Sequence, residues 1–195
     1  MASSMEMCAP QEVTIRFAHT RLDGHLGIPL SPLGMVVFAH GSGSGRFSPR
    51  NNTVARSLQQ GRVGTLLIDL LTPDEAEDRR KVFDIDLLAD RVLLAKAWLE
   101  QDDRTKGLGI GYFGASTGAS AALQAAARDP SSIQAVVSRG GRPDLAEAYL
   151  QSVTAPTLLI VGGDDEPVIE MNRADYRMLS CPKGLVIRTG RVTSI

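Results

Sequence analysis

The chain has 195 residues, 43% hydrophobic and 22% charged, which suits one globular domain with a sizeable core. Twenty-one basic and 22 acidic residues leave a net charge of −1, so nucleic acid and anionic membranes are disfavoured as partners. The two cysteines and three histidines show no ligand spacing, which argues against a disulfide framework and a metal site.

The N-terminal segment, residues 1–11, is expected to be disordered, and residues 12–195 are expected to form a single domain. The opening MASSMEMCAP lacks the basic and apolar regions of a signal peptide, and no apolar run is long enough to span a membrane. These features predict a cytoplasmic protein. Residues 12–18 alternate apolar and polar, and residues 26–30 follow a turn at 22–25, which predicts an antiparallel hairpin.

Four nearly continuous apolar runs follow the hairpin, as expected for strands buried on both faces of a parallel sheet. They cover residues 35–39, 63–71, 108–113 and 133–137, and two more strands are predicted at 157–161 and 185–187. Helices are predicted over residues 52–60, 85–100, 117–128 and near 167–179. This order predicts an α/β protein with a mostly parallel, twisted sheet and helices on both faces. The charged segment 72–81 is interpreted as a solvated loop.

The stretch from Gly114 to Gly118 fits the pattern G-x-S-x-G between an apolar strand and an alanine-rich helix. A serine at such a strand-to-helix turn is held exposed, and the amide of Thr117 can point at a developing oxyanion. We therefore interpret Ser116 as an acyl-accepting nucleophile. The alternative is an ordinary turn with a capping serine.

A second glycine-rich loop, His40-Gly41-Ser42-Gly43-Ser44, follows the strand that ends at Ala39. Its backbone amides can supply further oxyanion donors, and we assign Gly41, Ser42 and Gly43 to this role. The alternative is a phosphate-cradling loop with Arg46 and Arg50, although no Gly-Lys-Ser or Gly-Lys-Thr follows it.

Polar residues also follow two later strands. Asp164 and Asp165 come after one of them, where a carboxylate can orient a catalytic histidine or form a solvated turn. Arg139 and Arg142 follow another, where they can hold an anionic substrate group or form surface salt bridges. The dinucleotide-like pattern at residues 109–114 falls inside a strand, so it predicts no nucleotide cofactor.

With these segments assembled, the chain resembles the dienelactone-hydrolase-like branch of the α/β-hydrolase superfamily, over about residues 12–187. The likeness rests on VVFAHGSGSGRFSPRN, LLIDLLTPDE, GYFGASTGASAAL, VVSRGGRPDLA and LLIVGGDDEPV, which resemble a bacterial group sometimes fused to phosphoribosyltransferase domains. The resemblance implies Ser116 as the nucleophile, Asp165 as the triad acid, and an oxyanion hole made by residues 41–43 and the Thr117 amide. It also implies a small-molecule ester or lactone substrate and no cofactor.

The C-terminal stretch departs from the family pattern, in which a histidine follows the last strand in a segment resembling GATH and a final helix closes the fold. The corresponding stretch here reads TGRVTSI; the histidine position falls near Thr193, and the final helix is missing. His25 is expected on the far side of the sheet, and His40 opposite Asp165. We place His40, with Arg139 and Arg142, among the candidate substrate-binding residues.

Loss of the histidine costs a serine hydrolase on the order of a millionfold in turnover. The sequence therefore predicts an ester or lactone hydrolase that is impaired in this chain, or alternatively a non-catalytic scaffold that binds a ligand or a protein partner. A missing helix would leave apolar sheet surface uncovered, which predicts a contact surface for a second copy of the chain.

Overall fold

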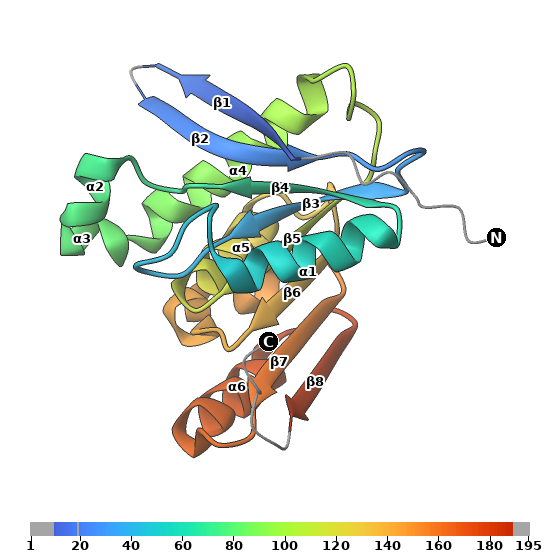
Figure 1. Ribbon diagram of the computed structural model, residues 1–195. Helices are drawn as coiled ribbons and strands as arrows, with labels where there is room; N and C mark the ends of the chain where they lie inside the picture. Colours follow the sequence, from blue (N-terminus) through green and yellow to red (C-terminus); the bar gives the residue numbers. More distant parts are fainter. Residues whose placement is uncertain (1–9, 19, 189–195) are drawn as a thin grey trace.

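The computed structural model describes residues 10–18 and 20–188, which form an eight-stranded sheet with helices on both faces (Figure 1). The strand order is β1-β2-β4-β3-β5-β6-β7-β8; β1 and β2 are antiparallel, as are β2 and β4, and the remaining neighbours are parallel. The strands are β1 (Gln11–Phe17), β2 (Thr20–Gly27), β3 (Gly34–Ala39), β4 (Val63–Ile68), β5 (Ile110–Ala115), β6 (Ile133–Arg139), β7 (Thr157–Gly162) and β8 (Lys183–Arg188).

Helix α1 covers one face of the sheet, and α4, α5 and α6 lie on the other face with the 3₁₀ segment η1 (Figure 1). The helices are α1 (Pro49–Gln60), α2 (Pro73–Glu77), α3 (Arg79–Val82), α4 (Ile85–Gln101), α5 (Thr117–Arg128) and α6 (Glu166–Met178), and η1 spans Pro143–Ser152. The predicted α/β class and mostly parallel sheet are confirmed.

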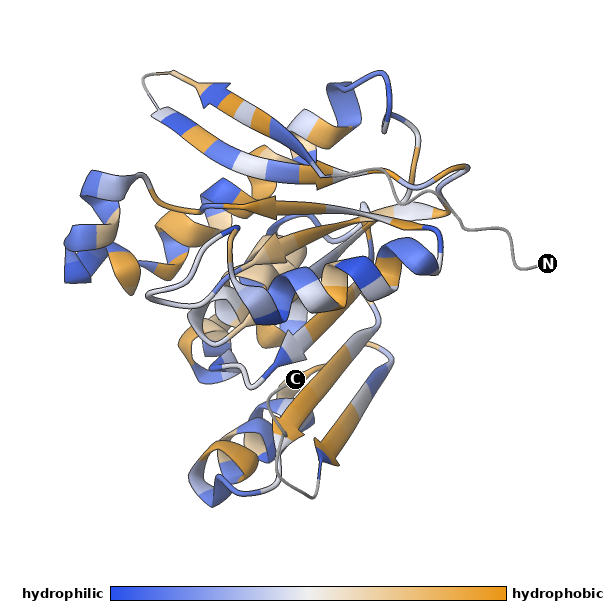
Figure 2. Cartoon of the chain, viewed as in Figure 1, coloured by the Kyte–Doolittle hydropathy of each residue, from blue (hydrophilic) through white to orange (hydrophobic). Residues whose placement is uncertain are grey.

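The core forms because the central strands are apolar on both faces and most helices pack an apolar face against them (Figure 2). Helix α5 is buried on all sides from Thr117 to Ala126. On the α4–α5 side, a large cluster includes Val37, Leu66, Val92 and Leu123, all with no exposed surface. A smaller cluster beneath α1 contains Phe38, Ala55, Leu67 and Phe113. Alanine fills much of α5, so this helix packs close to the strand that precedes it.

The predicted hairpin is present, but its turn is not where the sequence pattern placed it. Residues 22–25 lie inside β2, where Gly24 pairs with Val13 on one side and Ile68 on the other. The chain instead reverses after Phe17, where Ala18 has a positive φ of 48°. Asp23-Gly24 mimicked a turn, yet a glycine there permits close approach to β4: an added Cβ would lie 3.0 Å from the Leu67 carbonyl oxygen.

The prediction of a solvated loop over the charged segment 72–81 is wrong. The segment forms two short helices, α2 and α3. Thr72 begins α2 with a capping box, in which its hydroxyl accepts from the Glu75 amide and the Glu75 carboxylate accepts from the Thr72 amide. Glu75 also forms ion pairs with Arg91 and Lys81. The charges therefore anchor these helices to α4.

Apolar sheet surface is partly uncovered at the β8 edge, where Val186 is 42% exposed. Contact of a second copy with this surface stays a prediction. The predicted disorder of residues 1–11 lies outside the described residues except at its end, where Gln11 begins β1. Within residues 10–18 and 20–188, no helix is long and apolar enough to cross a membrane.

Candidate active site

Ser116 lies at the sharp junction between β5 and α5, in a backbone conformation that L-residues rarely adopt. Its φ is 51° and its ψ is −127°, which costs a non-glycine residue about 1–3 kcal/mol. Although Ser116 stands at the N-cap of α5, its side chain makes no capping hydrogen bond. The capping interpretation of this serine is therefore wrong, and the hydroxyl is available for chemistry.

The two glycines of the G-x-S-x-G pattern allow the tight turn, as predicted. A Cβ at Gly114 would collide with the backbone of Ala119, and one at Gly118 would collide with the carbonyl oxygens of Ala39 and His40. Because both positions lack a side chain, α5 begins directly against the end of β3. This approach brings the loop after β3 beside the serine.

The loop after β3 contacts Ser116 through Gly41. A Cβ added to Gly41 would lie 2.8 Å from the Ser116 Cβ and 3.5 Å from its Oγ, so only glycine fits without a shift. Within the described part of the chain, the amides of Ser42, Gly43 and Thr117 have no hydrogen-bond acceptor. An unpartnered amide at Thr117, next to the serine, and a glycine loop that contacts the serine through Gly41 have the chemistry of an oxyanion hole.

His40 locks this loop in place rather than serving as a base. Its Nε2 accepts from the Leu70 amide at 3.0 Å, so its Nδ1 carries the proton and donates to the Gly41 carbonyl oxygen at 2.9 Å. Burial lowers the pKa of His40, against the opposing effects of the Gly41 carbonyl and the Asp69 carboxylate. The ring is therefore neutral, and both of its nitrogens are occupied.

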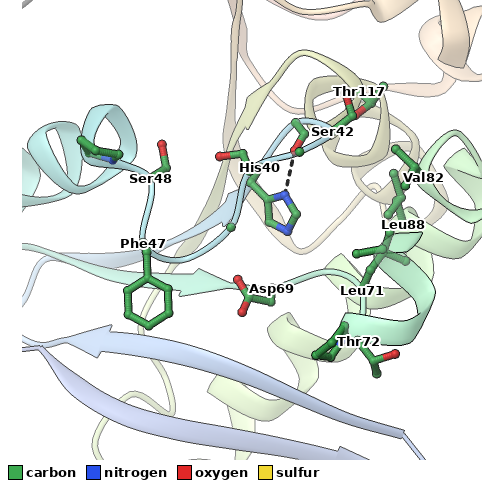
Figure 3. A pocket seen from close by; sticks show the side chains of 17 residues that line it. His40, Ser42, Phe47, Ser48, Asp69, Leu71, Thr72, Val82, Leu88 and Thr117 are labelled. Carbon is green, nitrogen blue, oxygen red and sulfur yellow. Dashed lines mark hydrogen bonds between the residues drawn. The ribbon is translucent and has the colours of Figure 1, made fainter. Parts of the chain in front are cut away.

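A cavity of about 620 Å³ opens beside the turn between β5 and α5 that carries Ser116, called the elbow below. It lies between the loop after β3 and the segment after β4 (Figure 3). It reaches Gly41 and Thr117, the neighbours of Ser116, whereas Ser116 itself does not line it. The full lining is His40, Gly41, Ser42, Gly43, Ser44, Gly45, Phe47, Ser48, Pro49, Asp69, Leu71, Thr72, Pro73, Ala76, Val82, Leu88 and Thr117. The cavity has the size and largely apolar walls of a small-molecule site.

One rim of the cavity is held by an ion pair and an aromatic contact. The Asp69 carboxylate accepts from the Arg46 amide at 2.6 Å and pairs with the Arg46 guanidinium. That guanidinium lies 4.4 Å from the Phe47 ring centroid, and the His25 ring packs edge-on against Phe47 at 4.9 Å. The expectation that His25 lies on the far side of the sheet from the site is therefore wrong, because its strand β2 borders β4.

Asp164 and Asp165 follow β7 at the same carboxyl edge of the sheet as the elbow, with β6 between β7 and β5. Asp165 caps α6, its carboxylate accepting from the Val168 amide at 3.3 Å, and both aspartates are solvent-exposed. An exposed carboxylate at this edge can accept a hydrogen bond from an imidazole. Its role as triad acid stays a prediction, and Thr193, where the family pattern puts the base, lies outside the described residues.

Comparison with known proteins gives the family of the chain. The dienelactone hydrolase of Anabaena variabilis is 54% identical in sequence, with a TM-score of 0.88 over 93% of this chain and 87% of that protein. The chain belongs to the dienelactone hydrolase family of the α/β-hydrolase superfamily. No family model matches it.

More distant structures share the α/β-hydrolase fold with this family member. An α/β serine hydrolase homologue from Coxiella burnetii is 17% identical, with a TM-score of 0.78 over 92% of this chain and 87% of that one. Est1E from Butyrivibrio proteoclasticus is 16% identical, with a TM-score of 0.76 over 90% and 88%.

Two curated relatives are Mycobacterium tuberculosis proteins, provisionally named phosphoribosyl transferases, that are 55% identical over 163 residues. The matching stretch is 84% of the present chain and 37% of each relative. The present chain therefore spans little more than a third of the length of these relatives.

The two arginines proposed for an anionic substrate lie outside the cavity lining of this dienelactone hydrolase family member. Arg142 forms two hydrogen bonds with the Asp144 carboxylate, at 2.8 and 2.9 Å, which is the salt-bridge alternative. Arg139 lies 5.9 Å above the Phe113 ring and contacts the Asn51 side chain at 3.5 Å. Binding of a substrate anion by either stays a prediction.

Two features that shape the site were not predicted from the sequence: a wall of the cavity and the hydrogen bonds that support the Ser116 turn. The cavity wall formed by α2 and α3 was interpreted as a loop, although the Thr72-x-x-Glu75 capping box was visible in the sequence. The support beneath the elbow was also missed: the Arg142 amide donates to the Ser116 carbonyl oxygen at 3.3 Å, and the Ser120 hydroxyl donates to the Arg142 carbonyl oxygen at 2.5 Å. No local pattern pairs these residues.

Proposed function

We propose that this chain is an ester- or lactone-cleaving serine hydrolase domain in which Ser116 is the nucleophile. The observation that carries the proposal is the strained conformation of Ser116, with an uncapped hydroxyl beside a glycine loop of unpartnered amides. Backbone strain of this kind is retained where function requires it. Membership in the dienelactone hydrolase family supports the same reaction class.

In the proposed reaction, Ser116 Oγ attacks the carbonyl carbon of the ester and loses its proton to a base. The oxyanion accepts hydrogen bonds from the Thr117 amide and from the amides of residues 41–43. The alcohol leaves with a proton from the base, and water then attacks the acyl-serine to release the acid. Asp165 would orient the base and stabilise its charged form.

No histidine of this chain is assigned as the base in this reaction. His40 has both ring nitrogens engaged, and the His25 ring packs against Phe47. Residues 189–195, after β8, contain no histidine. We therefore propose that the 195-residue chain by itself turns over esters poorly, at a level that an oxyanion hole and binding alone provide, about 10³ to 10⁴ over water.

Extending the chain tests this proposal. Adding a loop histidine and a closing helix after β8 should raise p-nitrophenyl acetate hydrolysis by orders of magnitude, and Ser116→Ala in the extended chain should abolish the gain. Asp165→Asn should remove most of it, whereas Asp164→Asn should not. A folded extended chain without any gain would refute the assignment of nucleophile and acid.

A non-catalytic binding scaffold is the second candidate, and the engaged nitrogens of His40 favour it. It predicts ligand binding in the cavity but no reaction of Ser116 in the extended chain. A phosphate-binding role for residues 41–45 with Arg46 and Arg50 is less well supported, because Arg46 is paired with Asp69. Calorimetric titration with inorganic phosphate should give no heat.

A further inference from the structure

The cavity beside the elbow is electrically neutral. Among the described residues that line it, the side chains able to carry charge are His40 and Asp69. His40 is neutral because burial lowers its pKa and both of its ring nitrogens are hydrogen-bonded. Asp69 is neutralised by Arg46, which contributes its amide and its guanidinium to the same carboxylate.

Among the described residues that line the cavity, this ion pair leaves no unpaired side-chain cation for a ligand. The Asp69 and Arg46 side chains are 24% and 19% exposed, so the pair is largely withdrawn from water. A ligand carboxylate would have to displace Asp69 from Arg46, or lie near Asp69 without a partner. Both alternatives are unfavourable away from the amides of Ser42, Gly43 and Thr117, which are assigned to the ester oxygen, because a desolvated anion requires a matched cation or hydrogen-bond donors.

The remaining walls are apolar or small. Leu71, Val82 and Leu88 form one side, and Phe47 lies on the opposite side of His40 and Asp69 (Figure 3). Phe47 is 66% exposed, and Arg46 and His25 hold its ring in place. An exposed aromatic ring fixed at a cavity rim offers a contact surface for an apolar or aromatic ligand group.

From this charge balance we infer that the cavity takes an uncharged aryl or alkyl group of the substrate and discriminates against a carboxylate at the same place. The inference rests on the proposed function, because it assigns the cavity to the substrate of Ser116. It deepens that proposal by naming the substrate class as neutral, apolar esters.

A matched pair of ligands tests the inference without turnover. Methyl 4-methylbenzoate and the monomethyl terephthalate anion have similar shapes and differ in a methyl group against a carboxylate. Binding of each to the full Ser116→Ala chain at pH 7 is measured by isothermal titration calorimetry, and the cavity residues are followed by NMR shifts. We expect the neutral ester to bind at least about 10-fold more tightly, which corresponds to about 1.4 kcal/mol.

Asp69→Asn and, as a substitute, Ala76→Arg should shift this preference toward the anion, and Asp103→Asn is the control. Asp69→Asn, made in the Ser116→Ala chain, frees Arg46 and should lower the neutral-to-anion affinity ratio at least about 10-fold. Asp103→Asn removes a carboxylate that is 88% exposed and pairs with Lys106, and it should leave the ratio unchanged. If Asp69→Asn does not fold, Ala76→Arg introduces a cation at an exposed helical position of the lining and should act in the same direction.

The outcomes separate this inference from the proposed function. Equal or tighter binding of the anion to the Ser116→Ala chain would overturn the inference, and so would no binding of either ligand. Neither result bears on Ser116, whose reactivity is measured by hydrolysis in the extended chain. A preference for the neutral ester together with an unreactive Ser116 would support the cavity assignment and refute the nucleophile.

Discussion

Replacing Ser116 by glycine should stabilise the protein, because the serine has a φ of 51° and a ψ of −127°. Such a conformation costs an L-residue about 1–3 kcal/mol and costs glycine almost nothing. Glycine loses about 0.5–1 kcal/mol through its more flexible unfolded state. The side chain of Ser116 makes no capping hydrogen bond that would be lost. The net expectation is a gain of about 1 kcal/mol in the free energy of unfolding.

Urea denaturation at pH 7, followed by circular dichroism, measures this change, and a gain of this size should raise Tm by about 2–4 °C. Ala127→Gly in α5 is the matched control, since its backbone is regular helix. It should lose about 1 kcal/mol. If Ser116→Gly destabilised the protein as much as Ala127→Gly does, the strained elbow would be refuted.

Three further predictions concern the loop, a buried acid and the histidine. Gly41→Ala places a Cβ 2.8 Å from the Ser116 Cβ, so in the extended chain it should shift the loop and slow labelling of Ser116 by a fluorophosphonate about 10²-fold, read by mass spectrometry. Burial and two neighbouring carboxylates raise the pKa of Asp175 to about 6. The folded state then holds more protons than the unfolded state between about pH 4 and pH 6, so stability should fall as pH rises through this window, by at most about 3 kcal/mol. Asp175→Asn should remove that pH dependence in urea titrations and be the more stable form at pH 7; an unchanged slope would contradict the assignment. His40→Ala leaves the Leu70 amide without its acceptor and the Gly41 carbonyl with the Ser44 amide as its remaining donor, and it should lower the free energy of unfolding by about 1–3 kcal/mol. A neutral effect would show that the ring does not hold the loop.

The order of strands and helices follows from the sequence because apolar runs and amphipathic stretches reflect burial directly. Helix α5 begins at Thr117 and ends at Arg128, as its alanine-rich composition predicts. The dinucleotide-like pattern at residues 109–114 does lie mostly inside β5, so its glycines do not form the turn between the strand and α5 where a pyrophosphate would bind. Patterns carried by neighbouring residues are therefore predictable.

Features that depend on distant residues were less accessible. Asp23-Gly24 has turn chemistry, yet its pairing with both β1 and β4 places it inside a strand. The charges of residues 72–81 indicated a surface loop. The partner of Glu75 is Arg91, sixteen residues away, so the sequence around Glu75 does not show that its charge is paired. The neutrality of the cavity depends on the Arg46–Asp69 pair, which joins two loops separated by β4 and α1.

The reactivity of one hydroxyl tests the central claim most directly. The folded extended chain, with its added loop histidine and closing helix, is incubated with a fluorophosphonate, digested and mapped by mass spectrometry. The urea-unfolded extended chain and a Ser152→Ala variant, at an exposed serine outside the cavity lining, are treated in the same way. The account predicts a phosphonylated serine at position 116, at a rate that unfolding abolishes and Ser152→Ala leaves unchanged. Modification spread over the exposed serines, or equal rates in folded and unfolded protein, would contradict Ser116 as an activated nucleophile.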